Sequence, residues 1–294
     1  MPTEILQAAP APTLDYRQPQ PARAGGCPLH RLFGTQSSTD QGAHDSSASV
    51  YARSGILAVG LVAYAMFFAT ILYAIGFVSG LVVPKHIDSG TIGGSILATL
   101  GINTALLSLF VVQHTIMARP AFKRWWTRFI PAPIERSLFV AAASACLMLL
   151  FWQWRPMPGL IWDLSGNRPV YWTLQAVALT GWVIVFLSSF MVSHWDLFGL
   201  RQVWLAACNL RYRPVAFRLV GLYRLVRHPL MVGFLIAFWV TPVMSTGHMF
   251  FAAMTTLYIL FGTWIEERDL VAQFGDEYRQ YQKRVRAFLP IPRA

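Results

Sequence analysis

The sequence is poor in charge and lacks the motifs of soluble enzymes. Of its 294 residues, 13% are charged and 55% are hydrophobic, a balance too apolar for a soluble globular domain. Its 3 cysteines show no C-x-x-C spacing, so neither a disulfide framework nor a metal site is expected. No G-x-G-x-x-G motif occurs, which excludes the usual strand–helix nucleotide-binding unit. Without a fixed internal repeat, the transporter folds built from inverted repeats are disfavoured.

Long uncharged runs are what the sequence has instead. Four of them approach or exceed the roughly 18 residues that span a bilayer: 54–84, 89–113, 137–154 and 169–193. A fifth run, 229–265, has 37 positions without Asp, Glu, Lys or Arg. As one helix it would reach about 55 Å, against a hydrocarbon core of about 30 Å. It must therefore fold back, and Pro242 with Ser245-Thr246-Gly247 supplies the break.

These runs predict an all-α polytopic integral membrane protein with five to six membrane helices, the last two forming a hairpin followed by a cytoplasmic C-terminal helix. Residues 1–50, rich in small and polar residues, are expected to be a flexible cytoplasmic tail. Residues 51–220 should hold four membrane helices on the substrate side, and 221–294 the terminal hairpin with a C-terminal segment. Basic residues follow the second and fourth spans, which places both termini in the cytoplasm.

The net charge of +11 lies mostly beside the predicted spans. Membrane lipids with anionic headgroups are therefore the expected partners, and neither nucleic acid nor an obligate protein partner is predicted. The positions of the charges beside these spans indicate a multi-pass membrane protein.

The hairpin would bring two distant polar clusters together. Glu266-Glu267 would return to the membrane face that holds Arg227-His228. A carboxylate pair beside the bilayer is costly unless it is solvated, paired or faces a cation. Beyond it, Tyr278, Tyr281 and Val285 have helical spacing, with Gly275 able to end one helix and Asp276 able to cap the next. An amphipathic helix lying on the membrane would show the same spacing.

The C-terminal quarter resembles the S-adenosylmethionine site of integral-membrane methyltransferases of the isoprenylcysteine carboxyl methyltransferase type. The likeness is carried by Arg227-His228-Pro229, Gly233, Glu266-Glu267, Leu270, Phe274-Gly275, Tyr278 and Tyr281. It implies S-adenosylmethionine as cofactor in a cytosolic-facing pocket, bound by Tyr223, Arg227, His228, Pro229, Gly233, Glu266, Glu267, Tyr278 and Tyr281. Met231 stands where that family often has Tyr, which argues against a prenylated or phospholipid-like acceptor.

The middle of the chain is similar to the bacterial methanethiol S-methyltransferases. The shared segments are Gln113–Pro120, Phe122-Lys123, Trp125-Trp126, Glu135-Arg136-Ser137 and Ser193–Trp204. The resemblance implies methyl transfer from S-adenosylmethionine to methanethiol, giving dimethyl sulfide. The transfer would be an in-line displacement by the thiolate.

A thiol must lose its proton to become the nucleophile, so a base is wanted near the methyl group. The candidate catalytic residues are His194, Asp196, His114 and Arg201, near cytoplasmic helix ends. His194 can pair with Asp196 only if the helix has already ended, because residues two apart on a helix point apart. Asp196 can instead pair with Arg201 or another His, and His114 can simply cap its helix.

Trp195, Phe198 and Trp204 are the candidate substrate-binding residues, since an apolar pocket suits methanethiol. Tryptophan at a membrane boundary is also a common anchor. His86 and His248 fall on the opposite membrane face and are expected to be structural.

Three other functions remain open. The first is methylation of another thiol, or of a lipid- or isoprenoid-linked thiol or carboxylate. The second is transport of a small solute, which charges in the middle of a span would favour, but every acidic residue lies near a membrane face or in a tail. The third is a non-catalytic membrane scaffold.

Overall fold

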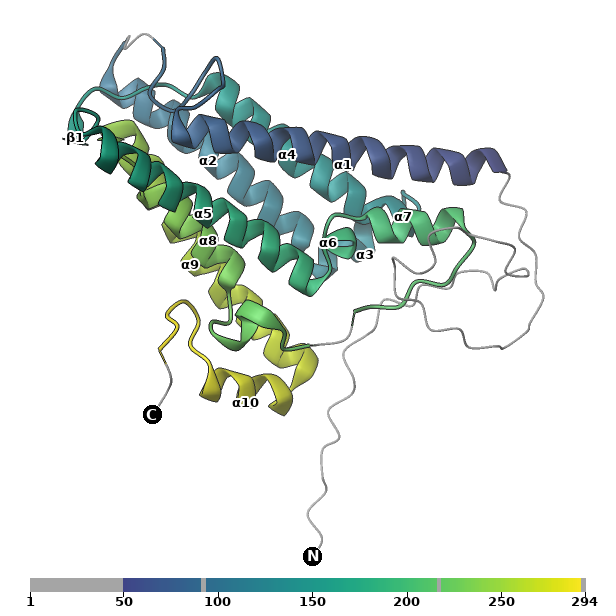
Figure 1. Cartoon of the computed structure of the whole chain (residues 1–294). Helices are drawn as coiled ribbons and strands as arrows, with labels where there is room; N and C mark the ends of the chain where they lie inside the picture. Colours follow the sequence, from purple (N-terminus) through teal and green to yellow (C-terminus); the bar gives the residue numbers. More distant parts are fainter. Residues whose placement is uncertain (1–49, 91–93, 216–217, 292–294) are drawn as a thin grey trace, which may run out of the picture.

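The computed structural model describes residues 50–90, 94–215 and 218–291, and it confirms the predicted all-α membrane architecture. Within those residues five helices are long and apolar enough to cross a membrane. They are α1 (Val50–Ser79), α2 (Ile96–Ala118), α4 (Glu135–Gln153), α5 (Arg168–Val192) and α9 (Thr246–Phe274). They run alongside one another as a bundle (Figure 1). The predicted tail, residues 1–50, lies almost wholly outside the described residues.

Local side chains set where the helices begin. The Ser95 hydroxyl accepts a hydrogen bond from the Leu97 N–H at the start of α2, at 3.2 Å. Asn167 accepts one from the Val170 N–H at the start of α5, also at 3.2 Å. Such caps satisfy backbone donors that have no partner inside the helix.

The first arm of the terminal hairpin decides between the five and six membrane helices that the sequence predicts. Its helix α8 (Pro229–Trp239) has 11 residues, about 16 Å, too short to cross a hydrocarbon core. The chain then continues in extended form through Pro242, which cannot donate a hydrogen bond to continue the helix. The predicted break is confirmed, and the missing helical length is covered by extended backbone.

Side chains and backbone from other segments satisfy the carbonyls exposed where α8 ends. The Phe238 carbonyl bonds to the His248 ring Nε2 at 2.9 Å. The Thr241 carbonyl accepts from the Trp162 indole at 3.0 Å, and the Pro242 carbonyl from the Leu164 N–H at 2.9 Å. Irregular backbone at membrane depth is tolerated only when its polar groups are paired in this way.

A small antiparallel sheet, not anticipated from the sequence, closes this end of the bundle. Strand β1 (Leu160–Asp163) follows α4, and strand β2 (Val243–Ser245) precedes α9. Leu160 pairs with Ser245 and Asp163 with Val243, with one irregularity in register between Leu160 and Trp162. His248, expected to be structural, is buried beside this sheet.

The closest helix packing joins α5 to α8 through two glycines. A Cβ added at Gly181 would lie 2.6 Å from the Gly233 carbonyl, and one added at Gly233 would lie 2.6 Å from the Gly181 carbonyl. Small residues let membrane helices approach backbone to backbone. Gly233, a predicted cofactor residue, therefore lies within this helix contact.

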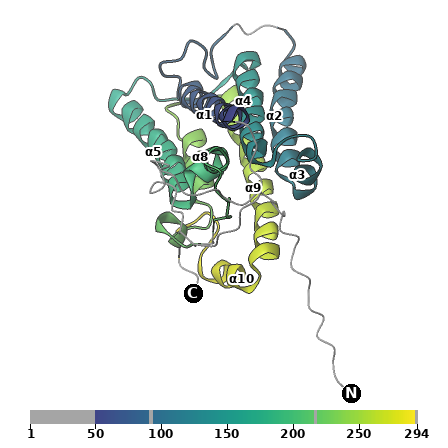
Figure 2. The ribbon, with the colours of Figure 1, turned by 90° about the vertical axis from the view of Figure 1, so that its right-hand side faces the viewer.

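Short helices gather at the opposite end of the bundle from the sheet. They are α3 (Pro120–Trp126), η1 (Ala132–Ile134), α6 (His194–Leu197), α7 (Leu200–Ala207), η2 (Gly221–Arg224) and α10 (Asp276–Arg284). Both views place α10 across the end of α9, and Figure 2 shows α3 beside α2. All but one of the predicted site residues, Gly233, lie at or near this end.

We expect Gly181→Ala to lower the free energy of unfolding by about 1–3 kcal/mol, because the new methyl group meets backbone that cannot yield. Gly262→Ala in α9 is the matched control, since a Cβ there meets no atom within 4 Å. Thermal unfolding of both variants in detergent measures the difference. Equal stability of the two variants would contradict a tight α5–α8 contact.

Candidate active site

The chain enters α8 through a segment fixed to the C-terminal end of the protein. Pro229 opens the helix, where its missing N–H costs nothing. Just before it, the Arg227 N–H donates to the Arg286 carbonyl at 2.9 Å and the His228 N–H to the Ala287 carbonyl at 3.1 Å. The residues after α10 thus hold the Arg-His pair in place.

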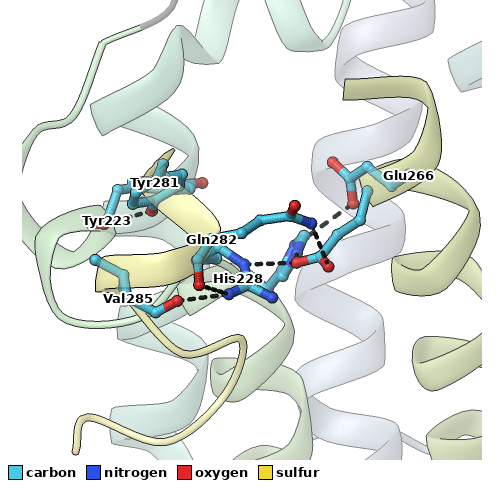
Figure 3. A network of polar contacts seen from close by, with 8 residues as sticks. Tyr223, His228, Glu266, Tyr281, Gln282 and Val285 are labelled. Atoms are coloured by element: carbon cyan, nitrogen blue, oxygen red, sulfur yellow. Dashed lines mark hydrogen bonds and ion pairs between the residues drawn. The ribbon is translucent and has the colours of Figure 1, made fainter. Parts of the chain in front are cut away.

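Glu267 is the centre of a polar network that joins α8, α9 and α10 (Figure 3). One of its oxygens accepts from Arg227 Nε at 2.6 Å and lies 3.0 Å from His228 Nε2. The other accepts from the Gln282 amide at 3.1 Å. Arg227 also donates through Nη1 to the carbonyls of Gln282, at 3.2 Å, and Val285, at 2.5 Å. With 7% of the Arg227 side chain exposed, this ion pair is largely removed from water.

Glu266 differs from its neighbour in exposure. Its side chain is 51% exposed, and its nearer oxygen lies 3.6 Å from His228 Nδ1. Glu267 lines an open groove of about 370 Å³ with Trp264, Arg268, Val271 and Gln282. Glu267 therefore links the helices through its ion pair, and the carboxylate of Glu266 remains accessible to a ligand.

Two buried tyrosines of α10 complete this cluster, as their spacing predicted. Tyr278 and Tyr281 are both buried, and the Tyr281 hydroxyl donates to the Tyr223 carbonyl at 2.5 Å. Burial raises the pKa of Tyr281 to about 12 and also raises that of Tyr223, so both stay neutral at physiological pH. Asp276 is the first residue of α10 and not its cap, a position that belongs to Gly275.

A second cluster surrounds Asp196 at the end of α5. Helix α5 ends at Val192 and α6 begins at His194, so His194 and Asp196 lie in a separate turn. The Asp196 carboxylate accepts from Arg201 at 2.9 Å and from the Tyr212 hydroxyl at 3.2 Å. Of the pairings left open by the sequence, the structure contains the one with Arg201.

His194 has partners at both ring nitrogens. Its Nε2 lies 2.9 Å from the Tyr64 hydroxyl, and its Nδ1 lies 2.8 Å from the Ser189 hydroxyl. Ser189 donates its hydrogen to the Phe186 carbonyl at 2.7 Å, so it accepts from Nδ1–H, and Nε2 accepts from Tyr64. Burial lowers the pKa of His194, which favours this neutral form.

His114 lies in a different environment. Its ring is enclosed by Phe110, Phe139 and Tyr258, with centroid distances of 5.2, 4.9 and 6.4 Å. Within the described part of the chain, its buried Nδ1 has no hydrogen-bond partner. Of the two predicted catalytic histidines, His114 is therefore the one with a ring nitrogen available for a proton.

Two of the three predicted substrate residues pack around His194. The ring centroids of Phe198 and Trp195 lie 4.8 and 5.3 Å from that of His194. Phe198 also stacks on Phe67 of α1 at 3.9 Å. Trp204 is half-buried in α7.

Several known proteins similar to this chain are named methanethiol S-methyltransferase. The chain is 52% identical over 235 residues to methanethiol S-methyltransferase 1 of Bradyrhizobium diazoefficiens, covering 80% of this chain and 82% of that protein. It is 48% identical over 235 residues to the methanethiol S-methyltransferase of Mycobacterium tuberculosis, covering 79% and 95%. The chain belongs to the methanethiol S-methyltransferase family.

More distantly, the chain is 30% identical over 184 residues to Nurim of Mus musculus, which covers 60% of this chain and 70% of that protein. No protein-family profile and no solved structure matches it.

Sequence reasoning missed several polar partners in this member of the methyltransferase family. Gln282 follows Tyr281 directly on α10, yet its residue type gave no signal for a bond to Glu267. Tyr64 and Tyr212 reach His194 and Asp196 from 130 and 16 residues away. Glu135 and Arg136 lie in a motif shared with the methyltransferases, but no role was predicted for either.

We expect Glu267→Gln to lower the free energy of unfolding by about 3–5 kcal/mol, because it leaves Arg227 buried without its counter-charge. Asp269→Asn is the matched control on the same helix. It breaks an ion pair with Arg119 whose side chains are 36% and 55% exposed, so the loss should stay below about 1 kcal/mol. Chemical unfolding in detergent compares the two. If Glu267→Gln lowered the free energy of unfolding as little as Asp269→Asn does, the network around Glu267 would not stabilise the fold as proposed.

Proposed function

We propose that this protein uses S-adenosylmethionine to methylate methanethiol, releasing dimethyl sulfide. The observation that carries the proposal is the family membership, because relatives named for this activity match about four fifths of the chain. The proposal includes a bacterial inner-membrane location with both termini in the cytoplasm, as the basic residues beside the second and fourth spans indicate. Residues 51–220 would then serve the thiol, and residues 221–294 the cofactor.

The terminal network has a donor and acceptor set that fits S-adenosylmethionine. The exposed Glu266 carboxylate can receive an ammonium, a sulfonium or ribose hydroxyls. Glu267 and Gln282 line an open groove of about 370 Å³. Arg227, His228 and Pro229 hold these acceptors in position, and Tyr223, Tyr278 and Tyr281 close the site from α10 and η2. When bound, S-adenosylmethionine supplies an electrophilic methyl group on a sulfonium.

The remaining chemistry for this chain is removal of the thiol proton. His114 can accept it at Nδ1, which is buried and has no hydrogen-bond partner among the described residues. The aromatic rings around His114 make its surroundings apolar, which suits an apolar acceptor better than a charged one. His194, already bonded at both nitrogens, would position the α1–α6 contact beside Trp195 and Phe198. The Asp196–Arg201 ion pair would fix the turn that contains Trp195 and Phe198.

Headspace gas chromatography on purified protein supplied with methanethiol and S-adenosylmethionine tests the reaction. We expect dimethyl sulfide from the wild-type protein. If none forms while the folded protein binds S-adenosylmethionine, methanethiol is not the acceptor and the proposed function is wrong.

We expect His114→Gln to reduce the turnover rate by about 10²–10⁴-fold, the usual contribution of a general base, while S-adenosylmethionine binding is retained. His86→Gln, at the opposite end of the bundle, is the control and should leave turnover unchanged. Turnover at the wild-type rate in His114→Gln would assign proton removal to another group. Binding of S-adenosylmethionine to each variant, measured by calorimetry, separates lost catalysis from lost folding.

A further inference from the structure

A second polar cavity lies beside the start of α4 and has no part in the terminal network. Its volume is about 230 Å³, and its lining comes from α3, η1, α4, α6, α7 and the segment after α7. The polar residues facing it are Lys123, Glu135, Arg136, Asp196, Gln202 and Tyr212. Two of them, Glu135 and Arg136, belong to a motif that the proposed reaction leaves without a role.

Glu135 is a buried residue whose carboxylate accepts no hydrogen bond in the described part of the chain. It is 4% exposed, and its electrostatic partner Lys123 does not approach to within 4.0 Å of it. A carboxylate removed from water is strongly destabilising unless a cation or donor compensates it. The side chain faces the cavity, so the missing partner belongs in the cavity.

Lys123 and Glu135 carry opposite charges and face the same cavity, but they do not form a close ion pair. The ammonium of Lys123 makes no hydrogen bond to any described residue. Burial, followed by the charge of Arg136, lowers the pKa of Lys123, and the charge of Glu135 only partly opposes this. The buried Oε1 of Gln202 also lacks a donor among the described residues. An anionic group near Lys123 and a cationic group near Glu135 would satisfy all three.

Asp196 does not change this balance, because Arg201 already neutralises it at 2.9 Å. A ligand with only a carboxylate would leave Glu135 unpaired, and a ligand with only an ammonium would leave Lys123 unpaired. A small ligand that carries both a negative and a positive charge would therefore fit the cavity best.

We propose that this cavity binds an α-amino acid group, with the carboxylate on Lys123 and Arg136 and the ammonium on Glu135 and Gln202 Oε1. Val192, Leu197 and Val215 also line the cavity and suit a short apolar side chain such as that of methionine. The group can come from a free amino acid. It can also be the amino-acid end of S-adenosylmethionine or S-adenosylhomocysteine, and that source rests on the proposed function.

Ligand analogues test the two charges on the unaltered protein, so folding of a variant is not in question. Calorimetry in detergent compares methionine with 3-(methylthio)propylamine, which lacks the carboxylate, and with 4-(methylthio)butyrate, which lacks the ammonium. We expect each analogue to bind at least about tenfold more weakly, since each leaves one buried charge unpaired. If methionine binds no more tightly than both analogues, and S-adenosylhomocysteine binding is unaffected by the variants below, the proposal is overturned.

Substitutions locate the binding. Lys123→Met and Glu135→Gln should each weaken methionine or S-adenosylhomocysteine binding by about tenfold. Arg124→Met, an exposed cation beside Lys123, and Glu277→Gln, an exposed carboxylate on α10, are the matched controls and should bind normally. Normal binding of both ligands by folded Lys123→Met and Glu135→Gln would place the ligand elsewhere.

Competition distinguishes the two sources. If methionine binds equally well in the presence of saturating S-adenosylhomocysteine, the cavity takes a free amino acid. If the two compete and the same substitutions weaken both, the cavity takes the amino-acid end of the cofactor. Binding is measured without methanethiol, so an absence of dimethyl sulfide from the wild-type protein would reject the proposed function and leave this result standing.

Discussion

The comparable reach of the two arms of the terminal hairpin is the constraint on which the site depends. From Thr246 to Glu266 helix α9 rises about 30 Å, one hydrocarbon thickness. The other arm combines about 16 Å of α8 with an extended segment of about 20 Å through Pro242. Because the two arms have comparable lengths, Arg227 and His228 meet Glu267 at the same level of the bundle. The carbonyls of Phe238, Thr241 and Pro242 at the end of α8 each have a hydrogen-bonding partner.

The neighbouring carboxylates at this level have separate tasks. Glu267 compensates Arg227 and binds Gln282, so it attaches α10 to the bundle and cannot easily be used elsewhere. Glu266 is half-exposed and makes one long contact with His228, which leaves it able to receive a cationic or hydroxyl-bearing ligand. In the proposed site, ligand binding and structural pairing therefore use different side chains, so a charged ligand could bind at the membrane surface without loosening the fold.

Run lengths and breakers were enough to predict the membrane helices, the terminal hairpin and the buried face of α10. They could not predict that α8 would stop after Trp239, because its early end depends on donors such as Trp162 and His248 from distant segments. The contacts in the two polar clusters likewise differ in how far the sequence could predict them. The meeting of Arg227, His228 and Glu267 follows from folding back one run, whereas the Tyr64–His194 bond depends on how α1 packs against α5. Sequence spacing constrains contacts along one element or one hairpin, and tertiary packing decides the rest.

The two candidate histidines show why residue type alone does not assign a base. Both lie near the same end of the bundle in aromatic surroundings, and both are largely shielded from water. Ser189 and Tyr64 fix one tautomer of His194, so protonating it would break its bond with Tyr64. The buried Nδ1 of His114 has no hydrogen-bond partner among the described residues, so a proton taken there breaks no hydrogen bond within them. Under the proposed function, a free ring nitrogen is the feature that distinguishes His114 from His194 as a candidate base.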